Sequence, residues 1–427
     1  MRTARDGTPA VRVVQLSTVD HRGGAARACL RLHHALRDAK LDSRLVCQRR
    51  TLDEEAIVGP PRGLRAGLAR LRGPLDRLPL QPFVDAHLGP WSPNWLPNPW
   101  LTRTLARLAP DVIHLHWIAS GFVPWRRLPR LRAPLVWTLH DLWPFTGGFH
   151  YLPEDDPRLE SGYARGRPGG RRYGIDLERR LFEQRRRILD GLDVLWVSPS
   201  RWLAELAGRG PLLARARIEV VPNGVDLSVF RPREAAAARV RLGLPQDRRI
   251  VLFVAMDALG DPRKGFRQLV EALGRLDPEA LGADLALVGQ RAGDALPPGL
   301  GSWRVHALGE LHGDDAVADA LACGDAFVAP SLQDNLPNTV SEAQACGLPV
   351  VAFAVGGIPE MVEHGRSGWL ARPGDASALA EGIRWALSAG PTARAAARDV
   401  AEHRFDVRRQ AARLLALYEE AISARPT

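Results

Sequence analysis

The chain has 427 residues, of which 45% are hydrophobic and 25% are charged, and its formal net charge is +10. This composition is that of a folded globular protein, and the length favours two domains over one. There is no uninterrupted run of about 18 apolar residues, which argues against a membrane-spanning helix. The opening residues, MRTARDGTPAVRVV, lack the apolar segment of a secretory signal, so a cytoplasmic location is predicted.

The charge is divided unevenly between the two halves. Residues 1–222 hold 36 Arg and Lys against 22 Asp and Glu, whereas residues 223–427 hold 22 against 26. A basic half could meet nucleic acid, anionic lipid or an anionic acceptor. No nucleic-acid-binding signature accompanies the charge, so nucleic acid is not expected as a partner. The four cysteines form no C-x-x-C pair, which argues against a zinc site or a disulfide framework.

Apolar runs alternate with helical or looped stretches along the whole chain. Strands are predicted in the first half at 11–17, 43–48, 111–117, 133–141, 193–200 and 218–224. A second series is predicted at 248–256, 283–289, 304–309, 326–331 and 349–355, with helices at 266–276 and 314–324 among its connections. This alternation is typical of an α/β protein with doubly wound parallel sheets, so we predict two Rossmann-like domains.

The first strand leads into a loop with two adjacent glycines, Gly23 and Gly24, before a predicted helix. Glycines let the backbone approach a ligand, and amides at a helix start can bind phosphate. A simple tight turn explains the pair equally well. The loop is not G-x-G-x-x-G, and no acidic residue ends the second strand, which argues against a dinucleotide oxidoreductase.

Residues 62–77 have the pattern of a basic amphipathic helix. Four leucines share one helical stripe and four arginines lie outside it: Leu64, Leu68, Leu71 and Leu75, and Arg62, Arg65, Arg70 and Arg72. The basic segment 165–187 has a similar character. Such helices can lie on an anionic membrane, which suggests reversible contact with the inner face of the cell membrane. The alternative is the solvated face of a domain helix.

Aromatic residues and histidines follow in the first half. Trp91 and Trp95 lie in GPWSPNWLPNPW, where they could stack on sugars or pack a proline-rich loop. The histidines of the strand PDVIHLHW alternate with apolar neighbours, which favours a structural role. His140 ends the next predicted strand and is followed by Asp141. His150 comes after two glycines in a loop that we expect to be mobile, where it could contact an acceptor.

Lysine is nearly absent: the chain has 56 arginines and only two lysines, Lys40 and Lys264. Lys264 lies in DPRKGF, in the first loop after the strand 248–256. A compact ammonium there can reach a phosphate without the bulk of a guanidinium, and Arg263 could assist it. The alternative is an ordinary solvated loop lysine.

The segment 330–360, PSLQDNLPNTVSEAQACGLPVVAFAVGGIPE, is the most informative part of the chain. A strand end is followed by a helix whose first turn is predicted to begin at Pro337, because proline suits the first helical position. The amides of Asn338, Thr339 and Val340 would then face a diphosphate. Two carboxylates, Asp334 before the helix and Glu342 within it, can accept hydrogen bonds from the hydroxyls of a sugar and a ribose.

These residues resemble a known family. Asp334 and Glu342, with seven residues between them and followed by AQACGLPVV, are similar to the E-x7-E signature of the retaining, nucleotide-sugar-dependent glycosyltransferases of family 4, which have the GT-B fold. Asp334 replaces the first Glu of that signature, and the usual Gly-x-Gly after it is missing. The segments PDVIHLHW and VWTLHDLWPFTGGFHY resemble a subgroup that builds exopolysaccharides such as colanic acid.

The resemblance implies a domain arrangement and residue roles. Residues 1–222 would form the acceptor-side domain and 223–405 the nucleotide-sugar domain, with a last helix at about 406–424 packing back on the first. His140 and Asp334 would position the donor sugar, Glu342 would hold the ribose, and Lys264 would neutralise the diphosphate. The glycine loop at Gly23 and Gly24 would cover the diphosphate and the acceptor.

The predicted function is therefore that of a hexosyltransferase-type glycosyltransferase in cell-surface polysaccharide biosynthesis. It would move a sugar from a UDP- or GDP-sugar to a hydroxyl of a glycan or lipid-linked glycan, with retention, without a metal and without a cofactor beyond the nucleotide-sugar co-substrate. No D-x-D metal clamp is found at a strand end. Two alternatives stay open: an inactive sugar-nucleotide-binding or membrane scaffold protein, and a sugar-nucleotide epimerase on the same fold.

Overall fold

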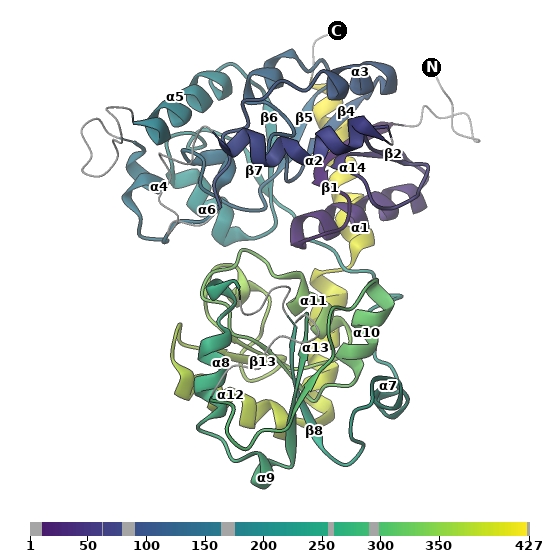
Figure 1. Cartoon of the computed structure of the whole chain (residues 1–427), viewed down its shortest axis with the longest axis vertical. Helices are drawn as coiled ribbons and strands as arrows, with labels where there is room; N and C mark the ends of the chain where they lie inside the picture. Colours follow the sequence, from purple (N-terminus) through teal and green to yellow (C-terminus); the bar gives the residue numbers. More distant parts are fainter. Residues whose placement is uncertain are drawn as a thin grey trace. The chain divides into compact units, whose positions relative to one another are not determined.

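The computed structural model describes residues 11–61, 63–78, 90–163, 176–254, 260–289 and 299–424. The chain divides into two compact units (Figure 1). Unit 1 comprises Met1–Val221 and Gln410–Thr427, and unit 2 comprises Pro222–Arg409. The last helix, drawn in yellow in Figure 1, therefore belongs to unit 1 for most of its length.

Unit 1 is built on a seven-stranded parallel sheet with the order β3-β2-β1-β4-β5-β6-β7. Its strands are β1 (Arg12–Val19), β2 (Asp42–Arg49), β3 (Ile57–Val58), β4 (Val112–Leu115), β5 (Leu135–Thr138), β6 (Val194–Ser198) and β7 (Ile218–Val220). Its helices are α1 (Gly24–Asp38), α2 (Leu64–Arg77), α3 (Pro99–Leu108), α4 (Pro157–Ser161), α5 (Leu177–Leu189), α6 (Arg201–Arg209) and α14 (Val407–Ser423).

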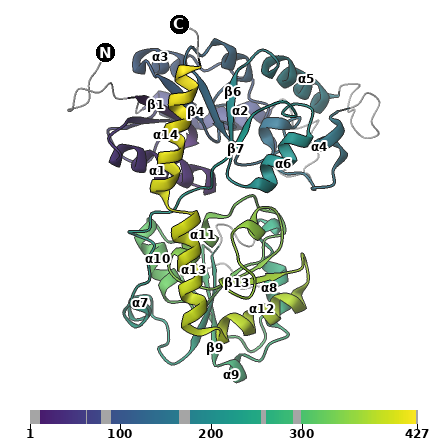
Figure 2. The ribbon, with the colours of Figure 1, turned by 180° about the vertical axis from the view of Figure 1, so that it is seen from behind.

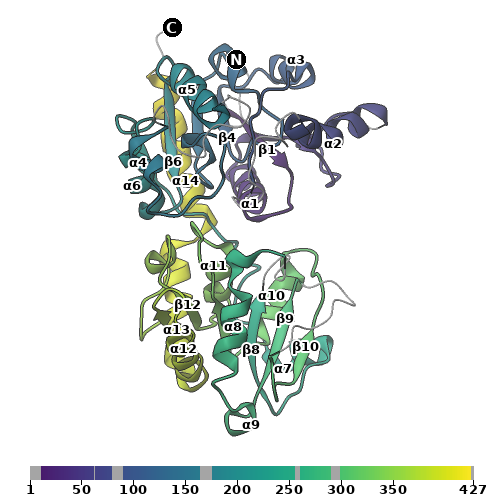
Figure 3. The same cartoon turned by 60° about the vertical axis from the view of Figure 1, so that its left-hand side comes forward.

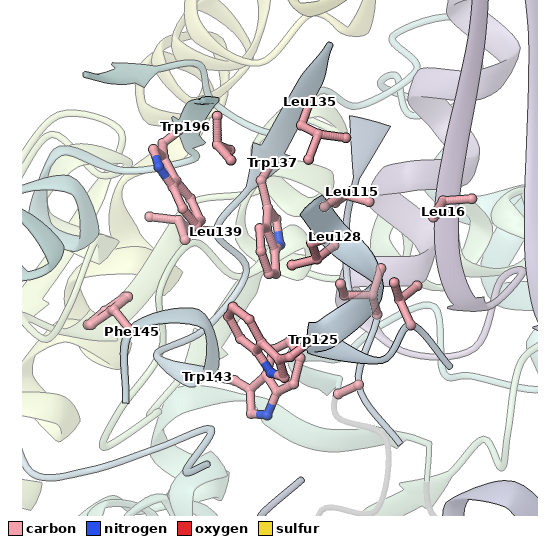
Figure 4. Packing of buried hydrophobic residues seen from close by; sticks show 14 of the residues in the cluster. Leu16, Leu115, Trp125, Leu128, Leu135, Trp137, Leu139, Trp143, Phe145 and Trp196 are labelled. Carbon is pink, nitrogen blue, oxygen red and sulfur yellow. The ribbon is translucent and has the colours of Figure 1, made fainter. Parts of the chain in front are cut away.

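The two faces of this sheet differ in chemistry. Successive strand residues point to opposite faces, so Leu16, Leu115 and Trp137 enter an apolar core. In that core Trp137 stacks on Trp196, with ring centroids 5.0 Å apart (Figure 4). The opposite face carries buried polar side chains and is covered by α1 and α14, which Figure 2 shows side by side. Unit 1 thus has one apolar layer and one layer in which buried polar side chains lie among apolar ones.

A buried arginine supports the apolar layer. The guanidinium of Arg185, on α5, lies 4.7 Å from the ring centre of Trp125 and 4.8 Å from that of Trp143. It donates hydrogen bonds to the backbone carbonyls of Trp143, Thr146 and Ser92. Burial lowers the pKa of Arg185 to about 9, so the side chain still carries its charge at neutral pH.

Unit 2 is built on a six-stranded parallel sheet with the order β10-β9-β8-β11-β12-β13 (Figure 3). Its strands are β8 (Arg249–Val254), β9 (Ala283–Val288), β10 (Val305–Ala307), β11 (Ala326–Ala329), β12 (Val350–Phe353) and β13 (Gly368–Ala371). Its helices are α7 (Ala235–Leu242), α8 (Phe266–Leu273), α9 (Pro278–Leu281), α10 (Asp314–Ala322), α11 (Asn338–Ala345), α12 (Ala376–Ser388) and α13 (Gly390–Arg404).

Both faces of the unit 2 sheet are apolar. Ile250 and Leu252 of β8 pack with α10, α11 and α13, whereas Val251 and Phe253 pack with α8 and α12. A parallel strand buried on both faces is expected to be almost continuously apolar, and β8 is. The predicted doubly wound α/β architecture is confirmed for both units, and all eleven predicted strands are present.

Candidate functional site

Lys264 and Asp334, which are 70 positions apart in the chain, form an ion pair in unit 2. Lys264 ends the short 3-10 helix η5 (Pro262–Lys264) that follows β8, and Asp334 lies in the loop between β11 and α11. The Lys264 Nζ lies 2.8 Å from the Asp334 Oδ2, with the two side chains 33% and 16% exposed. Both loops follow the carboxyl ends of neighbouring parallel strands, where ligands of such sheets bind. Two of the predicted site residues are therefore brought together.

Two glycines hold these loops in contact. Gly265 has a φ of +70°, and a Cβ on it would lie 1.7 Å from the carbonyl oxygen of Pro330. Gly356 has a φ of +56°, and its Cβ would lie 1.8 Å from the carbonyl oxygen of Asp334. Neither position can accept a side chain without moving the backbone that carries Asp334. Gly356, in the Gly-Gly pair after β12, thus allows the loop of Asp334 to pack closely.

Arg263 is engaged by its own loop. Its Nε and Nη2 donate to the two carboxylate oxygens of Asp261, at 3.0 and 2.7 Å. This paired geometry is the strong one for a guanidinium and a carboxylate. Arg263 therefore shares its charge with Asp261, and any diphosphate contact by Arg263 would compete with that pair. Lys264 is likewise paired with Asp334, so each of the two cations is held by a carboxylate of unit 2.

The start of α11 corrects two predictions. The helix begins at Asn338, with Pro337 as its N-cap rather than its first residue. The Val340 amide donates to the Pro337 carbonyl at 3.0 Å, so the prediction that it faces a diphosphate is wrong. This i to i−3 bond tightens the first turn and uses the third amide internally. Asn338 and Thr339 precede it and are both partly exposed.

Glu342 lies on α11 and is fully buried. Burial raises the pKa of the nearby Cys346 thiol to about 12, and the negative charge of Glu342 adds to that shift. A carboxylate at this depth can bind a ribose only from inside the unit. The predicted ribose contact of Glu342 therefore requires a ligand that reaches the buried side of α11.

The glycine loop of unit 1 is held by a buried carboxylate. Gly23 is the N-cap of α1 with a φ of +95°, and no atom lies within 4 Å of where its Cβ would be. Asp20, just before it, accepts hydrogen bonds from the amides of Thr51 and Leu52. Gly24 is the first residue of α1 and is exposed. The conformation at Gly23 favours glycine because of its backbone angle, and space is available beside it.

His140 follows β5 and is only partly exposed. Its Nε2 lies 3.1 Å from the Nδ1 of His116, whose own Nε2 lies 3.1 Å from the Oε1 of Gln15. Burial lowers the pKa of His140 to about 4, although the charge of Asp141 opposes the shift. Burial lowers the pKa of His116 still further. Both rings are therefore neutral at physiological pH.

His114, the histidine of β4, has only structural partners among the contacts described, in line with its alternation with apolar residues. His114 is fully buried between the hydroxyls of Tyr418, at 2.7 Å, and Thr138, at 2.7 Å. Tyr418 lies on α14, so this hydrogen bond joins the end of the chain to the centre of the unit 1 sheet. Burial lowers the pKa of His114 to about 3.

The side chains of His150 and Trp91, which were predicted to contact an acceptor, are both buried in unit 1, so the structure does not support these contacts. His150 is 1% exposed and lies between Asp141, at 2.6 Å, and the Ser92 hydroxyl, at 3.1 Å. Trp91 is 4% exposed and donates to the Gly147 carbonyl at 3.1 Å. The loop that holds His150 is packed, since the Gly148 Cβ position lies 2.1 Å from the Trp91 ring. Trp95 is 37% exposed and stays a surface residue.

Sequence reasoning missed the polar residues that support His140. Gln15 and Ser43 are fully buried within strands that were predicted from their apolar pattern. The signal was available, because a polar side chain inside an otherwise apolar strand needs a hydrogen-bonding partner. Their partners could not be named from one sequence, since they lie on other strands.

The described part of the chain has neither a cluster of metal-binding side chains nor a membrane-spanning helix. No cluster of three or more His, Cys, Asp or Glu side chains there is placed to hold a metal ion. Within the same residues, every helix is too short or too polar to cross a membrane.

Comparison with known families adds to this geometry. Residues 22–229 match the model of Glycosyltransferase Family 4, and residues 248–389 match the model of Glycosyl transferases group 1. Both halves of the chain are glycosyltransferase domains. The Lys264–Asp334 pair and α11 lie in the group 1 domain, and His140 lies in the family 4 domain.

A curated relative and three solved structures resemble the two glycosyltransferase domains. D-inositol 3-phosphate glycosyltransferase of Mycobacterium tuberculosis is 33% identical over 326 residues, which are 73% of this chain and 62% of the relative. The chain thus spans less than two thirds of the length of the curated relatives it matches.

The solved structures agree with the GT-B fold of the two domains. Sucrose-phosphate synthase from Thermosynechococcus elongatus matches with a TM-score of 0.70 and 20% identity, over 97% of this chain and all of that one. HepE of Anabaena, solved with UDP and glucose, matches with a TM-score of 0.62 and 20% identity, over 96% and 100%. WaaG, a glycosyltransferase of lipopolysaccharide biosynthesis, matches with a TM-score of 0.62 and 18% identity, over 95% and 99%.

Proposed function

We propose that the chain is an enzyme that transfers a sugar from a UDP- or GDP-sugar to a hydroxyl of a glycan or lipid-linked glycan. The observation that carries the proposal is the Lys264–Asp334 pair beside the start of α11, at the carboxyl ends of β8 and β11. It offers a cation and helix amides for a diphosphate, together with a carboxylate for sugar hydroxyls. The matching domain models support the same reaction class.

The residues of unit 2 would act on the leaving group. An ammonium has three N–H donors, so Lys264 can hold Asp334 and a phosphate oxygen at the same time. The amides of Asn338 and Thr339, at the start of α11, would bind the diphosphate, and Glu342 would accept from the ribose hydroxyls. Groups already in place stabilise the charge that grows on the diphosphate as the bond to the sugar breaks.

The proposed chemistry needs no protein nucleophile. The acceptor oxygen forms a bond to the anomeric carbon while the bond from that carbon to the diphosphate oxygen breaks. The acceptor proton passes to the departing phosphate. Attack on the side of the leaving group retains the anomeric configuration. Asp334 would hold sugar hydroxyls in place during this step, and His140 is proposed for a sugar contact because of the resemblance of its segment.

The related proteins indicate which donor and which acceptor to test first. HepE was solved with UDP and glucose, which favours a UDP-sugar as the first donor to test. The mycobacterial relative is a D-inositol 3-phosphate glycosyltransferase, which points to a small phosphorylated acceptor, whereas WaaG is involved in lipopolysaccharide biosynthesis. We infer an acceptor of cell-surface polysaccharide synthesis, in line with the exopolysaccharide-like segments around His140.

A donor screen tests the proposal. Purified protein in EDTA is heated with each of a panel of UDP- and GDP-sugars, because a bound ligand raises the melting temperature by mass action. We expect one donor to stabilise the protein and to release its nucleoside diphosphate slowly without added metal. Binding without release in the presence of varied acceptors would favour the inactive binding protein instead. Release that requires a divalent ion would contradict the metal-independent mechanism.

A membrane surface is the second part of the proposal, and α2 supports it. The helix is attached to unit 1 by its polar side: buried Asp76 accepts from the amides of Asn94 and Trp95, and Arg72 donates to the Gly121 carbonyl. Four leucines face outward instead and are 48–56% exposed: Leu68, Leu71, Leu75 and Leu78. The apolar stripe is therefore not the packed face of a domain helix. Arg62 and the side chains of Leu64 and Arg65 lie outside the described residues, as do residues 164–175 of the second basic stretch.

An exposed row of leucines flanked by arginines suits an anionic lipid surface. Arg70 and Arg77 are exposed beside it, and each arginine near such a surface contributes about 1 kcal/mol. The protein should sediment with vesicles that contain phosphatidylglycerol and less with vesicles of phosphatidylcholine alone. The double variant Leu71→Asp and Leu75→Asp should stay in the supernatant. Equal sedimentation of this variant would contradict the assignment.

A further inference from the structure

A buried line of hydrogen bonds crosses the polar face of the unit 1 sheet and ends at His140. Its members come from α1, β2, β1 and the ends of β4 and β5. In order, the line joins His33 Nδ1 to Ser43 Oγ at 2.8 Å, Ser43 Oγ to Gln15 Nε2 at 3.0 Å, Gln15 Oε1 to His116 Nε2 at 3.1 Å, and His116 Nδ1 to His140 Nε2 at 3.1 Å. The first four side chains are at most 4% exposed.

Gln15 determines which groups donate and which accept along this line of hydrogen bonds. Its Oε1 accepts from the Sγ of Cys29 at 3.5 Å as well as from His116, while its Nε2 donates to Ser43. Burial raises the pKa of the Cys29 thiol far above its usual value, so the sulfur keeps its proton and acts as the donor. Because Gln15 presents its oxygen on this side, the His116 Nε2 carries the proton of that hydrogen bond.

The tautomer of His140 follows from that of His116. A neutral imidazole has one N–H and one acceptor nitrogen, so a proton on the His116 Nε2 makes the His116 Nδ1 an acceptor. The partner of this Nδ1 is the His140 Nε2, which must then be the donor. The lowered pKa values of His116 and His140 agree with two neutral rings.

We propose that Gln15 and His116 are positioning residues that hold His140 with its proton on Nε2, so that Nδ1 is the acceptor nitrogen of that ring. This inference rests on the proposed function for its consequence: the His140 Nδ1 would accept a hydrogen bond from a hydroxyl of the donor sugar. The other tautomer of His140 would carry its proton on Nδ1. That nitrogen would then donate to a sugar oxygen, and the preference among donor sugars would change.

Nuclear magnetic resonance of the full chain tests the tautomers directly. Imidazole-15N-labelled protein is measured at pH 7, and the signals are assigned with His140→Gln and His116→Asn. We expect His116 and His140 each to show a protonated Nε2 and an unprotonated Nδ1. A proton on Nδ1 of either ring, or a doubly protonated ring, would overturn the inference. This readout does not depend on any activity.

A binding series separates positioning from simple packing. Asparagine can present its side-chain oxygen near the place of a histidine Nδ1, so His116→Asn should keep the donor-sugar affinity, and His116→Leu should weaken it about tenfold, the size of one hydrogen bond. Affinity for the nucleoside diphosphate alone should not change in either variant. Tyr418→Phe is the matched control, because Tyr418 contacts His114 and not His116. We expect it to leave both affinities unchanged.

The outcomes distinguish the two proposals. If His116→Leu and His116→Asn weaken the donor equally, His116 only fills space and the positioning role is overturned. If the wild-type protein binds no nucleotide sugar although both tautomers are as expected, the proposed function fails, and the sugar contact of His140 fails with it.

Discussion

The loops of unit 2 that carry Lys264 and Asp334 hold charged side chains, whereas the hydrogen-bonded groups next to His140 in unit 1 are uncharged. In unit 2, Lys264 and Asp334 are ionised groups that are 33% and 16% exposed. In unit 1, His140 is a neutral ring connected to a buried line of uncharged groups. A cation suits the binding of a diphosphate, and a neutral imidazole can accept a hydrogen bond from a hydroxyl. The difference agrees with the roles proposed above, a diphosphate contact for Lys264 and a hydroxyl contact for His140.

Burial also predicts which of the tryptophans of the proline-rich loop should matter to stability. Trp91→Ala should lower the free energy of unfolding by about 3–5 kcal/mol, because it removes a buried indole and its hydrogen bond to Gly147. Trp95→Ala is the control, since Trp95 is 37% exposed, and should change it by no more than about 0.5 kcal/mol. Urea unfolding measures both. A Trp91→Ala protein of normal stability with a raised acceptor KM would restore the acceptor role.

Lys264→Ala should show the reverse behaviour. We expect release of the nucleoside diphosphate to fall by at least about 100-fold with little change in stability, because the growing charge loses its nearest cation. Arg267→Ala, which removes an 85% exposed cation on α8, is the matched control. Initial rates on the best donor measure the effect. Full activity of Lys264→Ala would mean that the Lys264–Asp334 ion pair is not part of the active site.

Glu342→Ala should lower release of the nucleoside diphosphate by about 100-fold as well, through loss of the ribose contact. Because Glu342 is fully buried, the isosteric variant Glu342→Gln is needed to keep the packing of α11. Glu381→Ala removes an exposed acidic residue from α12 and serves as the control. Unchanged rates with both Glu342 variants would mean that the carboxylate is only part of the core.

Acid should weaken unit 1 through its buried histidines. Burial lowers the pKa to about 3 for His33 and His114, to about 4 for His140 and further for His116. Between these values and the ordinary pKa of about 6.5, the unfolded chain binds more protons than the folded one, so stability falls as pH falls. Each such histidine contributes at most about 1.4 kcal/mol per pH unit, a slope reached once the unfolded histidine is protonated.

Urea unfolding of the full chain at pH 7.5 and pH 5.5 checks this slope. His114→Asn should reduce it, because one buried titrating group is removed. Equal stability of the wild-type protein at the two pH values would contradict the neutral, buried state of the four histidines His33, His114, His116 and His140.

The fold could be predicted further than the site. The eleven predicted strands are apolar runs between turn signals, whereas β3 and β13 were missed because they are short and weakly patterned. The approach of Lys264 and Asp334 could be anticipated from the rule that loops after parallel strands meet at one edge. The Val340 amide was misassigned because the first turn closes with an i to i−3 hydrogen bond to the Pro337 carbonyl, which the sequence pattern does not reveal.

The packed state of His150 was not predictable from its neighbours in the sequence. Two glycines suggested mobility, but they are there because Trp91 and Tyr163 fill the space beside Gly148 and Gly147. Long-range partners of this kind, like those of Gln15, are set by the arrangement of strands and are invisible in a local pattern.

The most direct test compares the affinities of a nucleoside diphosphate and its nucleotide sugar by calorimetry for the wild-type protein, Lys264→Ala and His140→Ala. The charge of Lys264 should matter to both ligands, so Lys264→Ala should weaken both alike. His140→Ala should weaken only the nucleotide sugar, by about tenfold. Equal weakening of both ligands by His140→Ala, or no weakening of the diphosphate by Lys264→Ala, would contradict the division between a charged diphosphate site and a neutral sugar contact.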